Sequence, residues 1–457
     1  MRTGHANVRD IFAEGCRLTA GVYLSEDQQA MHALLRVRSS MPLGELTRGR
    51  RVFRGPIFKR MFAADSAHGR PYVSAKDIVQ ADIRPAGYLS ERHGALLDEL
   101  TLHEGMILVT CSGMNLGRAV WTRADMEGLC ASHDLIRIEP DPAKIPPGYL
   151  YAFLASRYGR VAIRRQIFGG SIKHVEPDHV ARIAVPRISP GVEARANELI
   201  CLGASARCRA NRLRREVISQ VHQSIGWSDI ATDLVREVSS TGLSSRMDAF
   251  YHSAQSHRAR TTLRECPESA PIYAVTRAVF EPPRGRRIRV DSPRRGVPFL
   301  SSSEVFRCDP EGDYLISLNT PEIEKLLVSE CDLLIPRSGQ IDGLIGRAVL
   351  PLPTYYGHAA SEHLVRIRCH DRADALYLWA ILASEPGYQA LVATAFGSSI
   401  PSLDCGLISQ IAVPWWRGDL RDACTNRISD ALSELNSAIL SEREALALVE
   451  KAIEEGG

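Results

Sequence analysis

The sequence predicts a mixed α/β protein with two tandem, structurally similar domains, separated by two long helices that form an antiparallel coiled coil. Three observations lead to this fold class. The chain resembles itself when it is shifted by about 228 residues. Each half contains short apolar or alternating segments, which are typical of strands. Each half also ends in a long segment with a heptad pattern, which is typical of a paired helix.

The self-similarity is collinear over nearly the whole chain. Chance could supply one match but hardly an ordered series. Because the period is far longer than that of a solenoid repeat, we interpret it as two copies of one domain. The matched stretches are Gly69–Ser74 with Gly296–Ser301, Gly117–Val120 with Gly346–Val349, Ala131–Ile138 with Ala360–Ile367, Phe168–Ile172 with Phe396–Ile400, and Ile183–Pro186 with Ile411–Pro414.

Each copy is expected to combine short strands with helices. Tyr149–Arg157 and its counterpart Ala375–Ser384 follow proline or charged loops and are expected to be helical. Proline ends the last strand of each copy because it cannot donate a ladder hydrogen bond. The strands expected in the first copy are Pro71–Ser74, Met106–Cys111, Ala119–Thr122, Leu135–Ile138 and Ile183–Pro186.

A long stretch with helical periodicity follows each copy. In residues 192–217 small or apolar residues recur at alternating spacings of four and three, and in residues 428–453 the same pattern is firmer, interrupted only by Glu442. Residues 191–226 carry six arginines and three acids, whereas residues 417–457 carry five bases and nine acids. We therefore expect the two helices to pack on each other. The alternative is two independent amphipathic helices, each folded onto its own domain.

These segments give the expected domain boundaries. The first domain covers residues 1–189, and the first long helix covers residues 190–226. The second domain covers residues 227–416, and the second long helix covers residues 417–457. A chain of 457 residues has room for about two to four ordinary domains, so its length agrees with this division.

The composition is that of a globular protein. Hydrophobic residues make up 45% of the chain and charged residues 24%, and the net charge is only +3. We expect neither a membrane span nor a secretory signal, since no stretch of about 18 apolar residues exists and no apolar region follows the N-terminus. The 11 cysteines are scattered and never spaced C-x-x-C, which argues against disulfides or structural zinc and favours the reducing cytoplasm.

Arginine dominates the basic residues. Only six are lysine, so 50 of the 56 basic residues are arginine. Arginine suits flat, bidentate recognition of phosphates and guanine edges. A GC-rich coding genome is the simpler explanation of this bias, so the bias alone does not predict a nucleic-acid partner.

The ordered motifs resemble a known family. Two variable α/β domains, each with F-G-x-S-I followed by an I-A-V-P strand and a long helix, resemble the specificity (S) subunit of type I restriction–modification systems. The start of the second copy, with Arg246, Asp248, Ala249 and Tyr251, and the G-x-P-[YF] strands resemble that family as well. The first copy departs from the pattern, because Thr19 stands at the position of the aspartate.

The resemblance implies a protein that reads DNA and is not an enzyme. Each α/β domain would be a target-recognition domain that reads one half of a bipartite double-stranded DNA site. The two helices would set the gap between the half-sites and dock two methyltransferase subunits, which modify adenine N6 with S-adenosylmethionine. A separate motor and nuclease subunit, which uses ATP and Mg²⁺, would join for cleavage. No cofactor is expected in this chain itself.

The residues themselves show no catalytic motif, which agrees with that implication. The sequence contains no G-x-x-x-x-G-K-[ST] phosphate loop, no G-x-G-x-x-G, and no N-P-P-Y or D-P-P-Y. The 14 histidines show no H-E-x-x-H spacing, so no metal site is expected. Residues 322–325 superficially resemble a nuclease carboxylate–lysine set, but such charged triplets are common at helix starts.

Two basic segments at equivalent places are the first candidates for DNA contact. Both precede the G-x-P strand of their copy, and cations at this density neutralise phosphates. The alternative is a solvated loop, but the shared position with a different sequence favours a common scaffold with divergent reading. The candidates are Arg50, Arg51, Arg54, Lys59 and Arg60 in the first copy, and Arg284, Arg286, Arg287, Arg289, Arg294 and Arg295 in the second.

The turn after the Met106–Cys111 strand supplies further candidates. It holds Asn115 in the first copy, and Arg337 and Gln340 in the second. Asparagine and glutamine can read adenine, and arginine can read guanine. We interpret the matched Arg118 and Arg347 as structural, because residues shared by both domains are poor readers of different bases.

The F-G-x-S-I motif lies beside the last two candidates, Lys173 and His174. They differ from their counterparts in the second copy and could reach bases. The shared Ser171 and Ser399 are better suited to cap a helix or to hold a phosphate.

Other function classes remain open at the level of sequence. The chain could be an assembly scaffold whose repeats bind proteins and not DNA. It could also read DNA for another methyltransferase-based phage-defence system. A fused nuclease or methyltransferase is the third class, and it would have to act on DNA as the purified chain alone.

Overall fold

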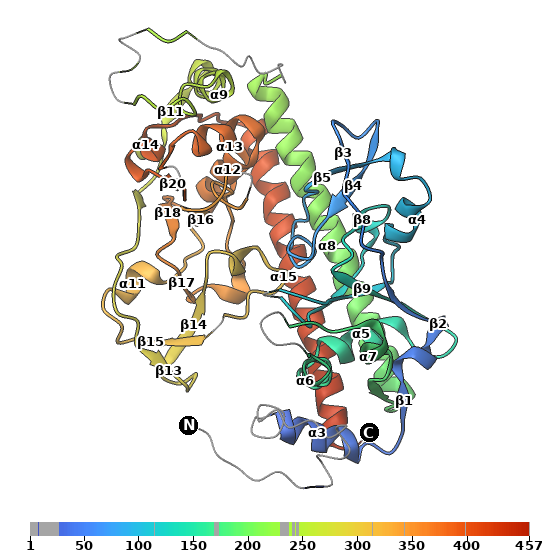
Figure 1. Ribbon diagram of the computed structural model, residues 1–457. Helices are drawn as coiled ribbons and strands as arrows, with labels where there is room; N and C mark the ends of the chain where they lie inside the picture. The colour runs from blue at the N-terminus through green and yellow to red at the C-terminus, as the bar shows by residue number, and fades with distance from the viewer. Residues whose placement is uncertain are drawn as a thin grey trace. The chain divides into compact units, whose positions relative to one another are not determined.

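The computed structural model divides into two compact units (Figure 1). The first contains the chain up to Cys208 together with Ser437–Gly457, and the second contains Arg209–Asn436. Each long helix is therefore shared, with one half in each unit. The residues that the structure describes are 8, 27–113, 115–168, 173–228, 237–239, 243, 246–312, 314–341, 343–397 and 399–456.

The first unit contains two four-stranded sheets and a short strand pair. The sheets have the strand orders β2-β9-β6-β7 and β3-β5-β4-β8, and β1 pairs with β10. The elements are α3 (Asp27–Arg36), β1 (Ser40–Pro42), β2 (Thr47–Arg54), β3 (Phe62–Ala63), β4 (Gly69–Val73), β5 (Gly87–Ser90), α4 (Leu96–Leu100), β6 (Ile107–Thr110), β7 (Ala119–Trp121), β8 (Cys130–Ala131), β9 (Leu135–Pro140), α5 (Pro147–Ala155), α6 (Arg157–Arg165), α7 (Pro177–Ala181), β10 (Ala184–Pro186) and the start of α8 (Pro190–Ile225).

The second unit repeats this plan. Its sheets have the orders β12-β18-β16 and β13-β15-β14-β17, β11 pairs with β21, and β19 pairs with β20. The elements are α9 (Ala254–Glu265), β11 (Ser269–Pro271), α10 (Ile272–Val275), β12 (Ala278–Phe280), β13 (Arg289–Val290), β14 (Gly296–Leu300), β15 (Tyr314–Ser317), α11 (Ile323–Leu326), β16 (Asp332–Pro336), β17 (Ala359–Ala360), β18 (Leu364–Arg368), α12 (Arg372–Ala383), α13 (Glu385–Val392), β19 (Ala395–Phe396), β20 (Ser402–Leu403), α14 (Cys405–Gln410), β21 (Ala412–Pro414) and the start of α15 (Asp419–Glu454).

The two units share strand register as well as strand order. In the first unit the parallel strands β4 and β8 pair Tyr72 with Cys130. In the second unit β14 and β17 pair Phe299 with Ala359, again in parallel. A parallel pair inside an otherwise antiparallel sheet is a specific feature of topology, so its recurrence at the matched residues shows that the two halves are copies of one fold.

Matched glycines explain why the chain breaks between α5 and α6 at the same point as between α12 and α13. Gly159 follows the junction of α5 and α6, and a Cβ there would lie 2.1 Å from the Phe153 carbonyl oxygen. Gly387 holds the same position at the start of α13, where a Cβ would lie 2.0 Å from the carbonyl oxygen of Ile381. No side chain fits at either point, so this helix break depends on glycine.

A matched buried arginine joins the two sheets of each unit. Arg137 and Arg366 are both fully buried. Arg137 donates to the carbonyl oxygens of Leu135 and Ala131 at 3.1 and 2.8 Å. Arg366 donates to those of Leu364 and Ala360 at 2.7 and 2.8 Å. Burial lowers the pKa of each guanidinium to about 10.

The long helices pack antiparallel within each unit, as predicted (Figure 1). In the first unit Arg195 of α8 pairs with Glu444 of α15, and Arg207 pairs with Glu442. In the second unit Arg209 pairs with Glu434. The residue numbers fall along α15 as they rise along α8. The mixed α/β class with paired helices is thereby confirmed.

The same helices also complete the core of each unit. Ala196 and Leu199 of α8, and Val449 and Ile453 of α15, belong to the core cluster of the first unit. In the second unit Arg214 of α8 lies over the ring of Trp379, at 4.9 Å from its centroid. The two sequence-based readings of the helices are therefore not exclusive, because each helix packs both on its partner and on a domain.

Two further observations concern the expected elements. The second copy has no strand matching β7 among its described residues, and only a bridge between Leu334 and Val349 takes that place. No helix in the described part of the chain has the length and apolar character needed to cross a membrane.

Candidate nucleic-acid interface

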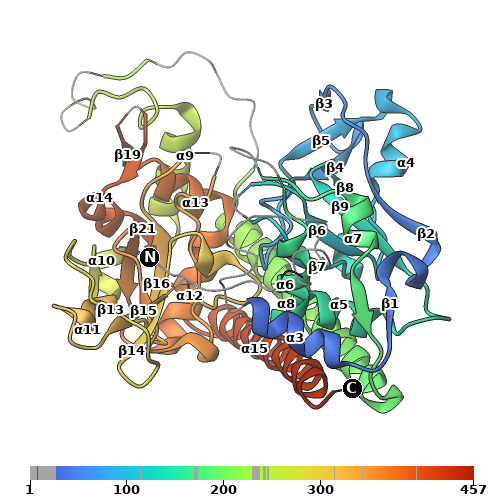
Figure 2. The ribbon, with the colours of Figure 1, turned by 60° about the horizontal axis from the view of Figure 1, so that its bottom comes forward.

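The first basic segment, residues 48–62, leads from β2 to the edge strand β3 (Figure 2). Arg54, at the end of β2, forms a 3.4 Å ion pair with Glu176. Lys59 and Arg60 lie in the loop that follows and are exposed. Arg60 lies 5.4 Å from the centroid of the Tyr72 ring. The structure places Arg50 in β2, but its side chain lies outside the described part.

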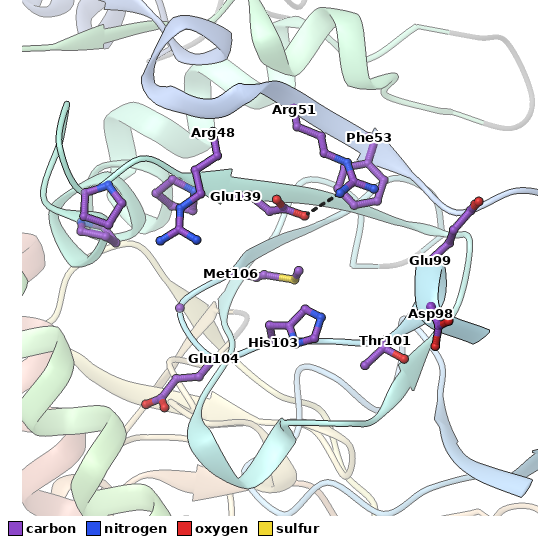
Figure 3. Close-up of a pocket in the computed structure, with 14 residues that line it drawn as sticks. Arg48, Arg51, Phe53, Asp98, Glu99, Thr101, His103, Glu104, Met106 and Glu139 are labelled. Atoms are coloured by element: carbon purple, nitrogen blue, oxygen red, sulfur yellow. Dashed lines mark hydrogen bonds and ion pairs between the residues drawn. The ribbon is translucent and has the colours of Figure 1, made fainter. Parts of the chain in front are cut away.

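A cavity of about 430 Å³ lies beside this segment (Figure 3). Arg48 and Arg51 of β2 point toward it, and Arg51 forms a 3.4 Å ion pair with Glu139. The guanidinium of Arg51 also lies 4.0 Å from the centroid of the Phe53 ring. Carboxylates outnumber these arginines around the cavity, so it does not attract a phosphate backbone. The carboxylates that line it are Asp98, Glu99, Glu104 and Glu139.

The second basic segment, residues 284–295, links β12 to β14 through the short strand β13. Two of its arginines are engaged within the unit. Arg287 pairs with Glu362, donates to the Tyr314 hydroxyl at 3.0 Å, and lies over the Phe299 ring. Arg289 lies 3.8 Å from the centroid of the Tyr314 ring.

The remaining arginines of the second basic segment face solvent. No carboxylate pairs with them among the described residues. The segment 284–295 itself contains only one acid, Asp291. They therefore form a strip of cations that a polyanion can reach without breaking an ion pair. These residues are Arg284, Arg286, Arg294 and Arg295.

The structure brings the two candidate loops together in each unit. In the second unit the amide of Gly339 donates to the Pro401 carbonyl at 3.1 Å, and the hydroxyls of Ser338 and Ser402 lie 2.7 Å apart. In the first unit the amide of Val175 donates to the Cys111 carbonyl at 3.2 Å. In the second unit the turn after β16 and the β19–β20 hairpin thus form one surface, and in the first unit the end of β6 lies beside Val175.

The predicted readers on this surface differ in exposure. Gln340 and Lys173 are exposed, whereas Asn115 and His174 are half-buried. The Asn115 carbonyl accepts from the Arg118 amide at 3.1 Å, which closes the turn that leads into β7. Ser171 lies outside the described residues, and Ser399 is exposed in the hairpin between β19 and β20.

An ion pair holds this surface together in both units. The matched strand position that forms it is positively charged in the first unit (Arg54) and negatively charged in the second (Glu281). In the first unit Arg54, at the end of β2 within the basic segment, pairs with Glu176, which follows the F-G-x-S-I motif. In the second unit Glu281 takes the position of Arg54, and it pairs with Arg337 of the turn. Sequence reasoning nominated both arginines and missed both acids.

The exchange was visible in the sequence as a reversal of charge between Arg54 and Glu281 at matched positions. The acid in the second unit also affects a thiol. Burial is the main cause that raises the pKa of Cys405 to about 12, and the negative charge of Glu281 is the second. Arg54 and Arg337 are therefore built into the junction of strand, turn and hairpin.

No cluster of three or more histidine, cysteine or acidic side chains in the described residues could hold a metal ion. The surface built here is therefore one of arginine, lysine, amide and hydroxyl groups on loops. Such groups contact phosphates and base edges through hydrogen bonds and charge.

Comparison by sequence finds no protein family and no curated protein that matches the chain. By structure, the chain is similar to the S subunit of a type I restriction–modification system from M. genitalium, with 12% identity, a TM-score of 0.37, and 91% of this chain and 95% of that chain covered. It is also similar to the HsdS subunit from Thermoanaerobacter tengcongensis, with 12% identity, a TM-score of 0.30, and 92% and 97% covered.

A third similar structure is described as the basis of complex assembly and conformational transition of the type I R-M system. It shares 13% identity and a TM-score of 0.30, with 92% of this chain and 98% of that chain covered. These TM-scores are low, so the duplicated topology and the surface chemistry of the chain itself carry the functional argument.

Proposed function

We propose that this chain is the non-catalytic, sequence-specific DNA-recognition subunit of a type I restriction–modification complex. In this proposal each unit carries a target-recognition domain that reads one half of a bipartite site in double-stranded DNA. The observation that carries the proposal is the duplication: one scaffold, matched in strand register, presents different side chains on equivalent loops. Two readers on one chain suit a target made of two dissimilar halves.

The basic segments support DNA as the ligand. Arg284, Arg286, Arg294 and Arg295 are exposed and without a carboxylate partner among the described residues. Lys59 and Arg60 are exposed in the matched segment of the first unit. Phosphate contacts of this kind supply affinity and position the protein, but they do not distinguish sequences.

The turn and hairpin surface supports base reading in the same way. Gln340 can bind adenine through two hydrogen bonds, and Lys173 can bind guanine. Their matched positions hold other residues in the other copy, as divergent specificities require. The ion pairs Arg54–Glu176 and Glu281–Arg337 hold the strand, the turn and the hairpin together, so that the reading side chains keep their positions.

The paired helices α8 and α15 are the proposed spacer between the two readers. We propose that they set the gap between the half-sites and dock two adenine-N6 methyltransferase subunits. S-adenosylmethionine would then be bound by those subunits, and ATP with Mg²⁺ by a motor and nuclease subunit. Because its substrate is chromosomal or invading DNA, we place the complex in the cytoplasm. A methyltransferase-based defence system without the nuclease is the alternative setting.

Equilibrium binding to duplex DNA tests the proposal. We expect the full chain to bind duplex DNA with an affinity that falls steeply between about 50 and 200 mM salt. Alanine at Arg284, Arg286, Arg294 and Arg295 together should reduce the slope of log affinity against log salt by about four, at about 0.9 per lost phosphate contact. The matched control is Arg417→Ala, an exposed arginine outside the basic segments.

Three outcomes would contradict the proposal. A flat salt dependence would mean that phosphates contribute nothing. Unchanged binding of the four-alanine variant would favour the scaffold hypothesis, in which the repeats bind proteins. If the purified chain alone methylated DNA with S-adenosylmethionine or cut it with Mg²⁺, the chain would be an enzyme and the non-catalytic role would be wrong.

A further inference from the structure

The loop that carries Lys59 and Arg60 also exposes three large apolar side chains. Ile57 is 76% exposed, Met61 is 43% exposed and Phe62 is 53% exposed. We call these three residues the apolar tip. Exposing several large apolar side chains close together in water costs free energy. Their clustering therefore indicates a surface that binds a ligand.

The loop holds the apolar tip in a defined position. The Met61 amide donates to Nε2 of His93 at 3.1 Å, and the Met61 carbonyl accepts from the Ser90 amide at 2.9 Å. Phe58 turns the other way and packs on the cluster that includes Tyr72 and Leu89. The exposed side chains are therefore presented by an anchored loop and are not the result of an unstructured one.

The chemistry around the apolar tip selects a polyanion. Lys59 and Arg60 lie between the apolar residues, and neither forms an ion pair among the described residues. The nearest acid in sequence, Asp65, is bound to His68, which donates at 2.7 Å. A ligand that offers apolar surface next to negative charge fits this pattern. Stacked bases between two phosphate backbones have that arrangement.

We infer that the apolar tip is a wedge that inserts between base pairs and unstacks the DNA in the half-site read by the first domain. This inference rests on the proposed function. Apolar wedges of Ile, Met and Phe with cations beside them open base steps and bend the duplex, at a cost of a few kcal/mol that the added contacts offset. The first domain would thus read how readily its half-site deforms in addition to its base edges.

The second domain presents one exposed apolar side chain where the first presents three, which makes the inference specific to one half-site. Residues 284–289, which match residues 57–62, contain a single apolar residue among the arginines, Ile288, which is 41% exposed. Pro282 and Pro283 occupy the preceding positions. We therefore expect distortion in the first half-site only.

The test uses the full chain and a duplex that it selects from a randomised pool. The fluorescent adenine analogue 2-aminopurine, which brightens when it unstacks, is placed in turn at each purine position of both half-sites. We expect brightening at one base step of one half-site when the wild-type chain binds. The double variant Ile57→Ala/Met61→Ala should abolish the brightening and weaken binding about tenfold, because apolar contact with the bases is lost.

Two control variants separate the wedge from other effects. Ile288→Ala removes the matched exposed side chain of the second domain and should leave the brightening intact. Lys59→Ala/Arg60→Ala should weaken binding and reduce the salt slope by about two, while the brightening at saturating protein stays. Phe62 is not substituted, since its ring packs on Tyr72, with 5.9 Å between centroids. Thermal unfolding of each variant checks that the fold is retained.

The outcomes distinguish the inference from the function on which it rests. If the pool yields no enriched duplex, both the proposed function and the wedge fail. If a duplex is enriched and bound but no 2-aminopurine brightens, or if the Ile57→Ala/Met61→Ala variant brightens it as the wild type does, the wedge is wrong and the reading function stands. The same holds if that variant binds DNA with undiminished affinity.

Discussion

At the scale of single residues, arginines of two kinds occur in this chain. Some are buried and serve the fold, and others are exposed and free to bind. Arg137 and Arg366 belong to the first kind, since each satisfies backbone carbonyls between two sheets. Arg284 and Arg286 belong to the second kind. The two kinds should respond differently to substitution.

Replacement of Arg366 by methionine should lower the free energy of unfolding by about 3 kcal/mol, because buried carbonyls lose their donors. Arg137→Met should have a similar effect in the first unit. Arg284→Ala is the matched control and should change stability by less than about 0.5 kcal/mol. Urea denaturation measures all three. A loss below about 1 kcal/mol for Arg366→Met would contradict the role assigned to this side chain.

Acid pH should release Arg287. Burial acts to raise the pKa of Glu362, but the hydrogen bond and charge of Arg287 outweigh it and leave the pKa below its ordinary value of 4.5. A carboxyl with a lowered folded pKa stabilises the fold above its unfolded pKa, and this contribution disappears as pH falls through the folded value. The difference in stability between wild type and Glu362→Gln should therefore be constant from pH 7 to about 5 and shrink below about 4. A difference that grows toward low pH would contradict this assignment.

At the scale of elements, the long helices show what a polar residue does in an apolar seam. Glu442 interrupts the heptad pattern of α15, and it forms two 2.7 Å hydrogen bonds with Arg207 of α8. Arg207 is only 2% exposed. One turn away, Gly203 lets the helices approach, since a Cβ there would lie 3.2 Å from the Ala438 carbonyl oxygen. The interruption in the pattern is thus a buried ion pair.

Glu442→Ala should destabilise the protein by about 3 kcal/mol, because it removes the carboxylate that pairs with the buried charge of Arg207. The control is Glu434→Ala, which removes the partner of the exposed Arg209 and should cost less than about 1 kcal/mol. Thermal unfolding compares the two variants directly. Equal effects would mean that Arg207 finds water in place of its partner.

Deletion of residues 437–457 should do more than change the spacing of the domains. Val449 and Ile453 lie in the core cluster of the first unit, so the deletion exposes that core. We expect the first unit to lose its cooperative unfolding transition while the second keeps its own. Limited proteolysis with mass spectrometry would show this as rapid cleavage before residue 208. A truncated chain with an intact first unit would show that α15 is a spacer and not part of the domain.

The sequence predicted the elements that have strong local patterns. The heptads predicted α8 and α15, and the apolar runs predicted β6 and β9 within a residue or two. The short strands β3 and β5 were not predicted, because strands this short carry little pattern and depend on their neighbours. The internal repeat strengthened these predictions, since each copy served as a second sequence for the other.

The candidate site was predicted only in part, because the partners of its charges lie far away in sequence. Arg51 pairs with an acid 88 residues away, and Arg287 with one 75 residues away. No local pattern shows which arginine will be neutralised in this way. The positions of Arg284 and Arg286 beside prolines and glycine did indicate exposed loops, and there the structure agrees.

At the scale of the whole molecule, duplication would allow one chain to recognise a divided target, as the proposed function requires. A common scaffold keeps the folding information in the matched residues, such as the buried arginines and the helix-breaking glycines. The unmatched residues on equivalent loops are then free to diverge. Under the proposed function, a change of specificity in one domain leaves the other domain and the helices unaffected.

The most direct test is selection of bound duplexes from a fully randomised pool by the full chain, followed by sequencing. The account predicts two short, dissimilar blocks of conserved bases, separated by a constant number of unconserved base pairs. Substitution of Gln340 should alter one block and leave the other block and the gap unchanged. A single uninterrupted block, two blocks at variable separation, or no enrichment at all would contradict the claim that two copies of one domain each read half of the target.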